Sequence, residues 1–375
     1  MISEDDMKII NVVGARPNFM KIAPLVKVMS QYEQIEQVLV HTGQHYDDNM
    51  SKLFFDDLLL PKPDIYLEVG SASHAVQTAS IMVKFEKILM EQKPDLVLVV
   101  GDVNSTIACA LVGAKLGIPV AHVEAGLRSF DKTMPEEINR VLTDSISEYL
   151  FVSEQSGVDN LLNEGVSAEK IFFVGNVMID TLLCYKSKAK GSKILEKLEI
   201  DSGGYALMTM HRPGNVDSRD RLDEIFDALG KIQDKLKIVF PVHPRTLDRI
   251  KGFGFDERYP FLNTDREGKS NFITVEPLGY LDFLHLMSNA KFVLTDSGGI
   301  QEETTVLGVP CLTLRENTER PATVNVGTNT ILGTDCRKIV EESARILQGQ
   351  VKTGGVPVLW DGKAAQRIVD VLLKK

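Results

Sequence analysis

Two carboxylates stand directly after strongly apolar segments of the chain. Asp102 follows Leu96 to Val100 in VVGDVNST, and Glu124 ends another apolar run in AHVEAGLRS. An ionised carboxylate beside buried strand residues costs several kcal/mol unless it is paired or used, so two in equivalent positions indicate an acid/base site. Capping of a helix by Asp102 and pairing of Glu124 with Arg128 explain these two residues equally well.

A third acidic feature is the segment TMPEEINR. Pro135 is expected to begin a helix, with Glu136 and Glu137 in its first turn. Acidic residues there also stabilise the helix dipole, and this alternative is strong when the segment is taken alone. Three carboxylates around one site could not all ionise cheaply, so one could serve as an acid and another as a base.

Positive charge follows the first apolar segment, in GARPNFMK. Arg16 and Lys21 lie in this segment and could offer positive charge to a phosphate or to a leaving oxygen. Helix capping and a solvated position are the alternatives for this pair. The segment lacks the G-x-G-x-x-G spacing, so no dinucleotide cofactor is indicated.

The segment FVLTDSGGIQEE has the pattern of an anion-binding turn. Ser297, Gly298 and Gly299 lead from an apolar strand into a helix. Glycine lets the backbone approach a ligand, and the unpaired N–H groups of a helix start favour a diphosphate. A tight turn requires glycine in any case, which is the alternative. Glu303, one turn into the helix, could accept both hydroxyls of a ribose, or could be a solvated surface residue.

Further polar residues follow other expected strands. His211 and Arg212 begin HRPGNVD after YALMTM, where an imidazole could bind a phosphate oxygen or donate a proton. His243 has an analogous place in VHPR, and Arg320 in TERP offers a second cation. Structural roles, or surface positions, are the alternatives for these residues.

The elements that must position these side chains alternate between short apolar runs and amphipathic helical patterns. A polar segment at 186–192 is typical of a linker, after which the alternation restarts. The pattern predicts two doubly wound α/β domains with parallel sheets, 7–185 with 361–375 and 193–360, the final helix packing back on the first domain. Strands are expected at 8–13, 35–40, 96–100, 119–123, 150–152, 172–174, 206–210, 238–242, 273–275, 292–295 and 310–314.

Composition narrows the classes of protein. The chain has 375 residues, 43% of them hydrophobic, and a net charge of -10, which disfavours nucleic acid as a partner. No apolar run of about 18 residues and no export signal is evident, so we expect a cytoplasmic protein without a membrane segment. The four cysteines have no metal-site spacing, so neither a metal nor disulfides are expected. We expect the cysteines to be buried free thiols.

In their order, these segments resemble the non-hydrolysing UDP-N-acetylglucosamine 2-epimerases. The resemblance spans nearly the whole chain and rests on GARPNFMK, HTGQHYD, GDVNST, HVEAGLRS, PEEINR, VGNVMIDTL, HRPGNVD, HPRT, TDSGGIQEE and TERP. It implies a glycosyltransferase-B-type fold with two Rossmann-like domains and a cleft between them. It also implies a homodimer, no cofactor, and reversible inversion at carbon 2 of UDP-N-acetylglucosamine. An epimerase of a related 2,3-diacetamido sugar and a glycosyltransferase of the same fold are the alternatives.

The resemblance also implies residue roles. The catalytic residues would be Asp102, Glu124, Glu136 and His211, with Asp102 and Glu136 as the leading proton-transfer pair. The substrate-binding residues would be Arg16, Lys21, Leu278, Phe283, Ser297, Gly298, Gly299, Glu303 and Arg320. Leu278 with Phe283 would hold the uracil. A possible regulatory site would comprise Gln44, His45, Arg212 and His243; Tyr46 stands where the family has Arg, which leaves regulation by substrate open.

Overall fold

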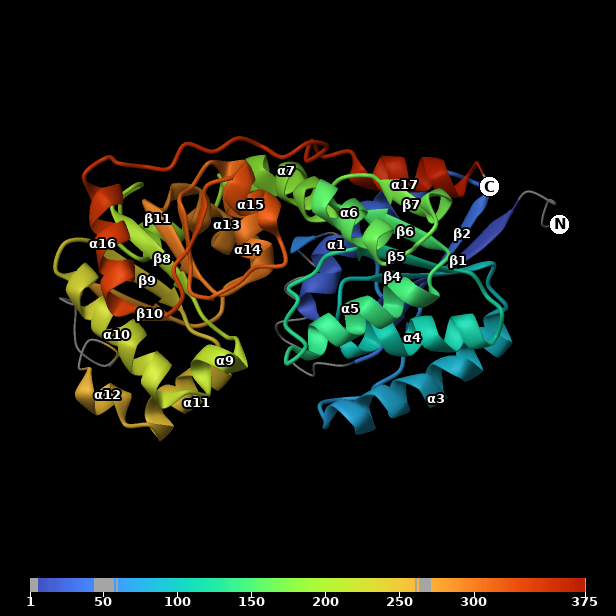
Figure 1. Cartoon of the computed structure of the whole chain (residues 1–375), viewed down its shortest axis with the longest axis horizontal. Coiled ribbons are helices and arrows are strands. Elements are labelled where there is room, and N and C mark those ends of the chain that lie inside the picture. Colours follow the sequence, from blue (N-terminus) through green and yellow to red (C-terminus); the bar gives the residue numbers. More distant parts are fainter. Residues whose placement is uncertain (1–5, 44–56, 59, 260–261, 263–270, 375) are drawn as a thin grey trace. The chain divides into compact units, whose positions relative to one another are not determined.

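The chain divides into two compact units. The computed structural model describes residues 6–43, 57–58, 60–259, 262 and 271–374. Unit 1 comprises Met1–Cys184 and Val358–Lys375, and unit 2 comprises Tyr185–Pro357. Each unit is a parallel sheet whose strands alternate with helices along the chain (Figure 1).

The sheet of unit 1 has the strand order β3-β2-β1-β4-β5-β6-β7, with all pairs parallel. Its order reverses between β1 and β4, and in open parallel sheets ligands bind at such a switch point, beyond the carboxyl ends of the strands. The strands are β1 (Met7–Val13), β2 (Ile35–His41), β3 (Ile65–Tyr66), β4 (Leu96–Val100), β5 (Val120–Ala125), β6 (Tyr149–Val152) and β7 (Ile171–Phe173).

Helices cover both faces of this sheet. In Figure 1, α3, α4 and α5 lie along one side, while α17 lies on the other side and packs against α1. The helices are α1 (Arg16–Met29), α3 (His74–Gln92), α4 (Asn104–Lys115), α5 (Pro135–Ile146), α6 (Gln155–Asn163), α7 (Val177–Ala189) and α17 (Ala364–Leu372), with the short 3-10 helix η1 (Ala168–Lys170).

Unit 2 repeats the plan with the order β10-β9-β8-β11-β12-β13, again parallel, and its order reverses between β8 and β11. The strands are β8 (Tyr205–Thr209), β9 (Lys237–Pro241), β10 (Phe272–Val275), β11 (Phe292–Thr295), β12 (Cys311–Thr313) and β13 (Asn329–Ile331). The helices are α8 (Ile194–Lys197), α9 (Pro213–Val216), α10 (Arg219–Gln233), α11 (Pro244–Gly252), α12 (Phe255–Arg258), α13 (Tyr280–Asn289), α14 (Gly298–Leu307), α15 (Pro321–Asn325) and α16 (Cys336–Leu347).

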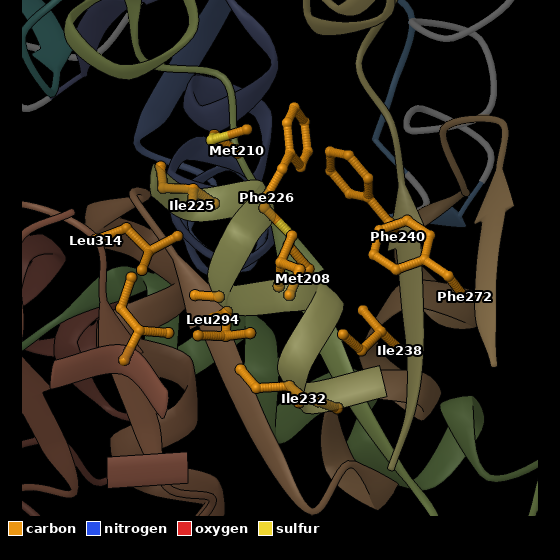
Figure 2. Packing of buried hydrophobic residues seen from close by; sticks show 14 of the residues in the cluster. Met208, Met210, Ile225, Phe226, Ile232, Ile238, Phe240, Phe272, Leu294 and Leu314 are labelled. Atoms are coloured by element: carbon orange, nitrogen blue, oxygen red, sulfur yellow. The ribbon is translucent and has the colours of Figure 1, made fainter. Parts of the chain in front are cut away.

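Each sheet is held by its own apolar core. In unit 2, side chains from alternate positions of β8 and β9, such as Met208 and Phe240, meet Phe226 of α10 (Figure 2). In unit 1, Val97 and Val99 of β4 belong to the core into which α3 inserts Phe85. The helix patterns follow from this burial, because one face of each helix covers a sheet face that is apolar throughout.

The predicted strands and the fold class are confirmed. Every expected strand is present, and the structure adds β3 and β13, which are too short for a periodic pattern. The expected linker at 186–192 is wrong in its first half, because residues 186–189 form the last turn of α7. The expected final helix is present as α17, and it belongs to unit 1.

Residues 358–375 are fastened to unit 1 by polar contacts. The indole N–H of Trp360 donates to the carbonyl of Ser153 at 2.8 Å. The carboxylate of Asp180 accepts the N–H groups of Ala364 and Ala365 at 3.1 and 2.7 Å, at the start of α17. Burial raises the pKa of Asp180 to about 6 although these N–H groups lower it.

The cysteines are free, as expected, but not uniformly buried. Cys109 and Cys311 are buried, whereas Cys184 is exposed and Cys336 is half-buried, so the prediction of burial is wrong for these two. Cys184 sits on the outward side of α7, a position that its neighbours in sequence do not reveal. Within the described part of the chain, no helix is long and apolar enough to cross a bilayer.

Candidate active site in two halves

The candidate acids of unit 1 lie at the switch point of its sheet. Asp102 follows β4, and Glu124 is the second-last residue of β5. Lys21 lies in α1, the helix that follows β1. Since β1, β4 and β5 are neighbours in the sheet, their carboxyl ends place these side chains along one edge. This is the location at which parallel α/β sheets bind ligands.

Glu124 has an unusual backbone and a charged partner. Its φ is 73°, in the left-handed region, where the register of β5 against β6 shifts between Val123 and Ala125. Non-glycine residues in this region are strained and cluster at functional sites. Oε2 of Glu124 forms an ion pair with Nζ of Lys21, and both side chains are buried. The expected alternative, a pair between Glu124 and Arg128, is therefore wrong.

Gly101 makes room for this ion pair. A β-carbon at Gly101 would lie 2.7 Å from Nζ of Lys21 and 3.5 Å from Oε2 of Glu124. The ion pair of Lys21 and Glu124 therefore lies against Gly101, the residue before Asp102. The φ of Gly101 is 68°, which independently favours glycine at this position.

Asp102 is held by a buried arginine. Nη1 of Arg140 in α5 donates to Oδ2 of Asp102 at 2.5 Å, and the Asp102 side chain keeps 20% of its surface exposed. Helix α4 begins at Asn104 with Val103 as its cap, so the alternative that Asp102 caps this helix is wrong. An ionised carboxylate with an accessible face can exchange a proton with a ligand.

The two adjacent glutamates of α5 have different surroundings. Glu137 is buried, and it accepts the N–H groups of Ser129 and Phe130 at 2.9 and 2.8 Å as well as the guanidinium of Arg140. Burial acts to raise the pKa of Glu137, but Ser129 and Arg140 hold it below its ordinary value. Glu136, the expected catalytic member of the pair, is half-buried in the first turn of α5.

Three predicted residues of unit 1 cannot be placed. Gln44 and His45, the expected regulatory residues, lie outside the described residues. Arg16 begins α1, but its side chain also lies outside what the structure describes.

The candidate residues of unit 2 gather at its own switch point. His211 follows β8 and Asp296 follows the neighbouring β11. Asp296 is fully buried and accepts the N–H of Arg212 at 2.9 Å, while Nδ1 of His211 lies 3.1 Å from Oδ1. Burial acts to raise the pKa of Asp296, but His211 and Arg212 outweigh it and hold the pKa below its usual range. The His211 side chain stays 47% exposed, so Nε2 is available to a ligand.

The anion-binding turn has the expected form. Ser297 precedes α14, whose first two residues are Gly298 and Gly299, and the Ser297 side chain makes no capping hydrogen bond. The free end of a helix of this length attracts an anion. Gly298 also admits neighbouring side chains, since a β-carbon there would lie 2.6 Å from Nη1 of Arg320.

Arg320 is buried and paired with two acids. Its Nε donates to Glu302 and its Nη1 to Glu319, both at 2.6 Å. Arg315 donates to the other oxygen of Glu319 at 2.7 Å. The predicted surface alternative for Arg320 is therefore wrong. Its charge is shared with Glu302 and Glu319, and it lies against Gly298 at the start of α14.

The expected nucleoside residues lie beside this turn. Leu278 and Phe283, both half-buried, flank the start of α13, which contacts α14. Glu303 is buried within α14 and accepts the hydroxyl of Tyr280 at 2.8 Å. Burial raises the pKa of Glu303 to about 7, although the Tyr280 bond acts against this shift. The surface alternative for Glu303 is thus wrong.

The remaining two expected regulatory residues have structural contacts. Arg212 caps α9, and its Nη2 lies 3.8 Å from Oε1 of Glu319. His243 caps α11, where its ring accepts the N–H of Arg245 at 3.3 Å.

Sequence reasoning did not assign four residues that hold these sites together. Arg140 and Tyr280 bind candidate functional carboxylates, while Asp144 and Asp296 anchor the segments that carry them. Two of them had a local signal: Arg140 lies one turn after Glu136 and Glu137 in PEEINR, and Asp296 directly follows the apolar strand in FVLTDSGG. Within the described ranges, no group of three or more His, Cys, Asp or Glu is arranged to hold a metal ion.

Two parallel-sheet units, each with its candidate residues at the switch point, define a two-domain nucleotide-sugar enzyme fold of the glycosyltransferase-B type. The model of the UDP-N-acetylglucosamine 2-epimerase family matches residues 27–373. The chain therefore belongs to the UDP-N-acetylglucosamine 2-epimerase family, whose members are isomerases.

Individual relatives match along nearly their whole length. The chain is 43% identical to the UDP-N-acetylglucosamine 2-epimerase of Methanocaldococcus jannaschii, covering 98% of this chain and 99% of the relative. It is 39% identical to the UDP-2,3-diacetamido-2,3-dideoxy-D-glucuronate 2-epimerase of Pseudomonas aeruginosa, over 98% of this chain and 100% of the relative. The crystal structure of the M. jannaschii enzyme in complex with UDP-GlcNAc and UDP superposes with a TM-score of 0.90 at 42% identity, covering 98% and 100%.

Proposed function

We propose that this chain interconverts UDP-N-acetylglucosamine and UDP-N-acetylmannosamine by eliminating and re-adding UDP. The single observation that carries the proposal is the presence of two acids bound to buried cations at one sheet edge, Asp102 with Arg140 and Glu124 with Lys21. The first relative named above bears this activity in its name and shares 43% of its residues with this chain.

The chemistry requires both a stabilised leaving group and proton-transfer groups. The hydrogen on carbon 2 is not acidic in the intact sugar, because no carbonyl is adjacent. Breaking the bond between the anomeric carbon and the UDP oxygen develops positive charge at carbon 1, and a base can then remove the proton from carbon 2. The product is 2-acetamidoglucal with free UDP. Re-addition of UDP at carbon 1 and return of a proton to the opposite face of carbon 2 give the manno epimer.

In unit 1, Asp102 and Glu136 are the proposed proton-transfer pair. Both are partly accessible and lie on segments joined by Arg140, which donates to Asp102 from the helix that Glu136 begins. Glu124 is the proposed relay or positioning acid, because its ion pair with Lys21 is buried. Lys21 and Arg16 are proposed to offer positive charge to a phosphate or to the leaving oxygen.

In unit 2, the start of α14 is the proposed diphosphate site, with Ser297, Gly298 and Gly299 as its turn and Arg320 behind it. His211 would bind or protonate a phosphate oxygen through Nε2, since Nδ1 faces Asp296. Glu303 would accept the ribose hydroxyls, and Leu278 and Phe283 would contact the uracil. These assignments make unit 2 the UDP-binding domain and unit 1 the domain of the acids.

Proton NMR of UDP-N-acetylglucosamine with the protein in deuterated water tests the proposal. We expect the manno epimer to appear, with deuterium at carbon 2 in both epimers. Transfer of the sugar to an added acceptor would instead indicate a glycosyltransferase. Recovery of unchanged, undeuterated substrate would refute the proposal for this sugar.

A second candidate substrate is a UDP-2,3-diacetamido sugar. The observation that favours it is the 39% identity, over 98% of the chain, to the P. aeruginosa enzyme that bears such a substrate in its name. The same NMR experiment with the diacetamido sugar, run in competition with UDP-N-acetylglucosamine, would rank the two by their rates.

A homodimer is also part of the proposal. Helices α3 and α5 each present apolar side chains to solvent: Val76, Val83 and Met90 are 58%, 61% and 64% exposed, and Ile138 and Leu142 are each 49% exposed. The first three recur every seven residues along α3, which is the spacing of a helical contact face. A second copy of the chain is the proposed occupant of these surfaces.

A further inference from the structure

A buried histidine on β5 joins two strand ends of unit 1. His122 is fully buried, its Nδ1 lies 2.7 Å from Oδ1 of Asp144, and its Nε2 lies 2.8 Å from the carbonyl oxygen of Gly101. Asp144 belongs to α5, and Gly101 is the first residue after β4. The imidazole therefore connects three elements of the domain.

The hydrogen bonds of this pair have defined partners. The Gly101 carbonyl can only accept, so Nε2 of His122 donates to it. Oδ2 of Asp144 accepts the N–H of Gly126 at 3.0 Å and lies 2.7 Å from Nη1 of Arg128. Burial acts to raise the pKa of Asp144, but His122 and Arg128 hold it below its usual value.

The contacts of this pair adjoin the candidate acids. Gly101 immediately precedes Asp102. His122 and Gly126 stand two residues before and two residues after Glu124. Asp144 lies two turns along the helix whose first turn carries Glu136. A single buried pair thus contacts the backbone or the helix from which each of the three acids projects.

The held backbone is left-handed at three positions and strained at one of them. Gly101, Glu124 and Gly126 have φ values of 68°, 73° and 79°. Glycine adopts this conformation readily, but at Glu124, which has a β-carbon, it persists only where surrounding contacts over-determine it. The hydrogen bonds to the Gly101 carbonyl and the Gly126 N–H supply such contacts on either side of Glu124.

We infer that His122 and Asp144 are positioning residues that set the relative placement of Asp102, Glu124 and Glu136 for proton transfer at carbon 2. They reach the reacting atoms only through the segments that they anchor. The inference rests on the proposed function and deepens it, because it assigns a catalytic consequence to a buried pair away from the ligand.

The test compares four variants. His122→Asn keeps an amide near Nδ1, facing Asp144, whereas His122→Gln can reach toward the Gly101 carbonyl. Asp144→Asn removes the charge that pairs with the ring. Glu164→Gln is the matched control, because Glu164 pairs with Arg128 at 2.8 and 2.7 Å in the same network but adjoins none of the three acids. For each variant, kcat, KM, the Kd of UDP and the melting temperature are measured.

We expect kcat to fall about 10- to 100-fold in His122→Asn and Asp144→Asn, since misplacing catalytic groups by about 1 Å costs up to roughly 100-fold. KM and the Kd of UDP should change less than about threefold. His122→Gln should retain more activity than His122→Asn. Glu164→Gln should retain kcat even if its melting temperature falls as much as that of the other variants.

Two results would overturn the inference. One is kcat within about threefold of wild type in both His122→Asn and Asp144→Asn. The other is a loss of kcat in all four variants, Glu164→Gln included, that is proportional to the fall in melting temperature. That result would show that the network is purely structural. A wild-type chain that does not exchange the hydrogen on carbon 2 would instead remove the proposed function, and this inference with it.

Discussion

Arg140 donates to Asp102 across the gap between α5 and β4, at 2.5 Å, while its other N–H groups donate to Glu137 on its own helix. One buried cation thus joins an accessible acid to a buried one. The buried acid, Glu137, accepts the N–H groups of Ser129 and Phe130. Through Arg140, the accessible acid Asp102 is therefore connected to this loop.

The first prediction concerns this cation. Arg140→Met should lower kcat by about 100-fold or more and destabilise the protein by about 3 to 5 kcal/mol, because it leaves two acids without their buried partner. Arg140→Lys, which keeps the charge but not the planar fork, should recover part of both. Turnover and urea unfolding measure the two effects, and a Met variant with wild-type turnover would contradict the role given to Arg140.

The second prediction concerns the glycine beneath the Lys21 ion pair. Gly101→Ala should abolish most activity, because its β-carbon would meet Nζ of Lys21 at 2.7 Å on a left-handed backbone. The matched control is Gly117→Ala, whose φ of 73° is similar but whose β-carbon would meet nothing within 4 Å. The control should lose about 1 kcal/mol of stability and keep its turnover. Equal turnover in the two variants would argue against a site at Gly101.

The third prediction concerns the start of α14. Gly298→Ala should weaken UDP binding by about tenfold or more, because a β-carbon would press on the buried ion pair of Arg320 and Glu319 and intrude on the helix end. Gly355→Ala in the same unit would meet only a methyl group at 3.8 Å and should bind UDP as wild type does. Isothermal titration with UDP distinguishes the two variants.

The fourth prediction is a pH dependence from Glu303. Its folded pKa is raised from 4.5 to about 7 by burial, so its contribution to stability is fully present below about pH 4.5 and is lost as the pH rises through 7. Glu303→Gln should match wild type at pH 5 and be more stable at pH 8, by about 3 kcal/mol at most. Melting curves of both ligand-free proteins at the two pH values test this, and a constant difference would contradict it.

The fifth prediction concerns self-association. Glutamate in place of Val83 and Leu142, which are 61% and 49% exposed on α3 and α5, should shift the protein from dimer to monomer in light scattering. Val351→Glu changes an equally apolar residue, 42% exposed, in unit 2 and should leave the dimer intact. A wild-type chain that is already monomeric at micromolar concentration would refute the dimer.

Sequence periodicity was sufficient for the strands because both sheets are covered on two faces, so nearly every strand is a continuous apolar run. The exceptions have physical reasons. β3 has two residues and β13 reads Asn329-Thr-Ile331, and neither has the length or polarity of a buried strand. The supposed linker at 186–192 contains Lys186, Ser and Lys188 followed by Ala, and these residues extend α7 to Ala189.

The positions of the candidate residues at strand ends were predictable from the sequence, but their pairings were not. The ends of apolar strands identified Asp102 and Glu124, yet the partner of Glu124 is Lys21, 103 residues earlier, and not the nearby Arg128. The left-handed backbone at Glu124 turns its carboxylate toward Lys21. Arg128 instead meets Asp144 and Glu164, whose positions follow from the packing of α5 and α6 rather than from local sequence.

The return of residues 358–375 to unit 1 has a consequence during synthesis. Unit 2 is encoded without interruption by 185–357, so it can close its core while the chain is still attached to the ribosome. Unit 1 lacks α17, and with it the partner of Asp180 and the indole bound at Ser153, until that last stretch emerges. Unit 1, which begins first along the chain, is therefore completed only after all of unit 2 has been synthesised.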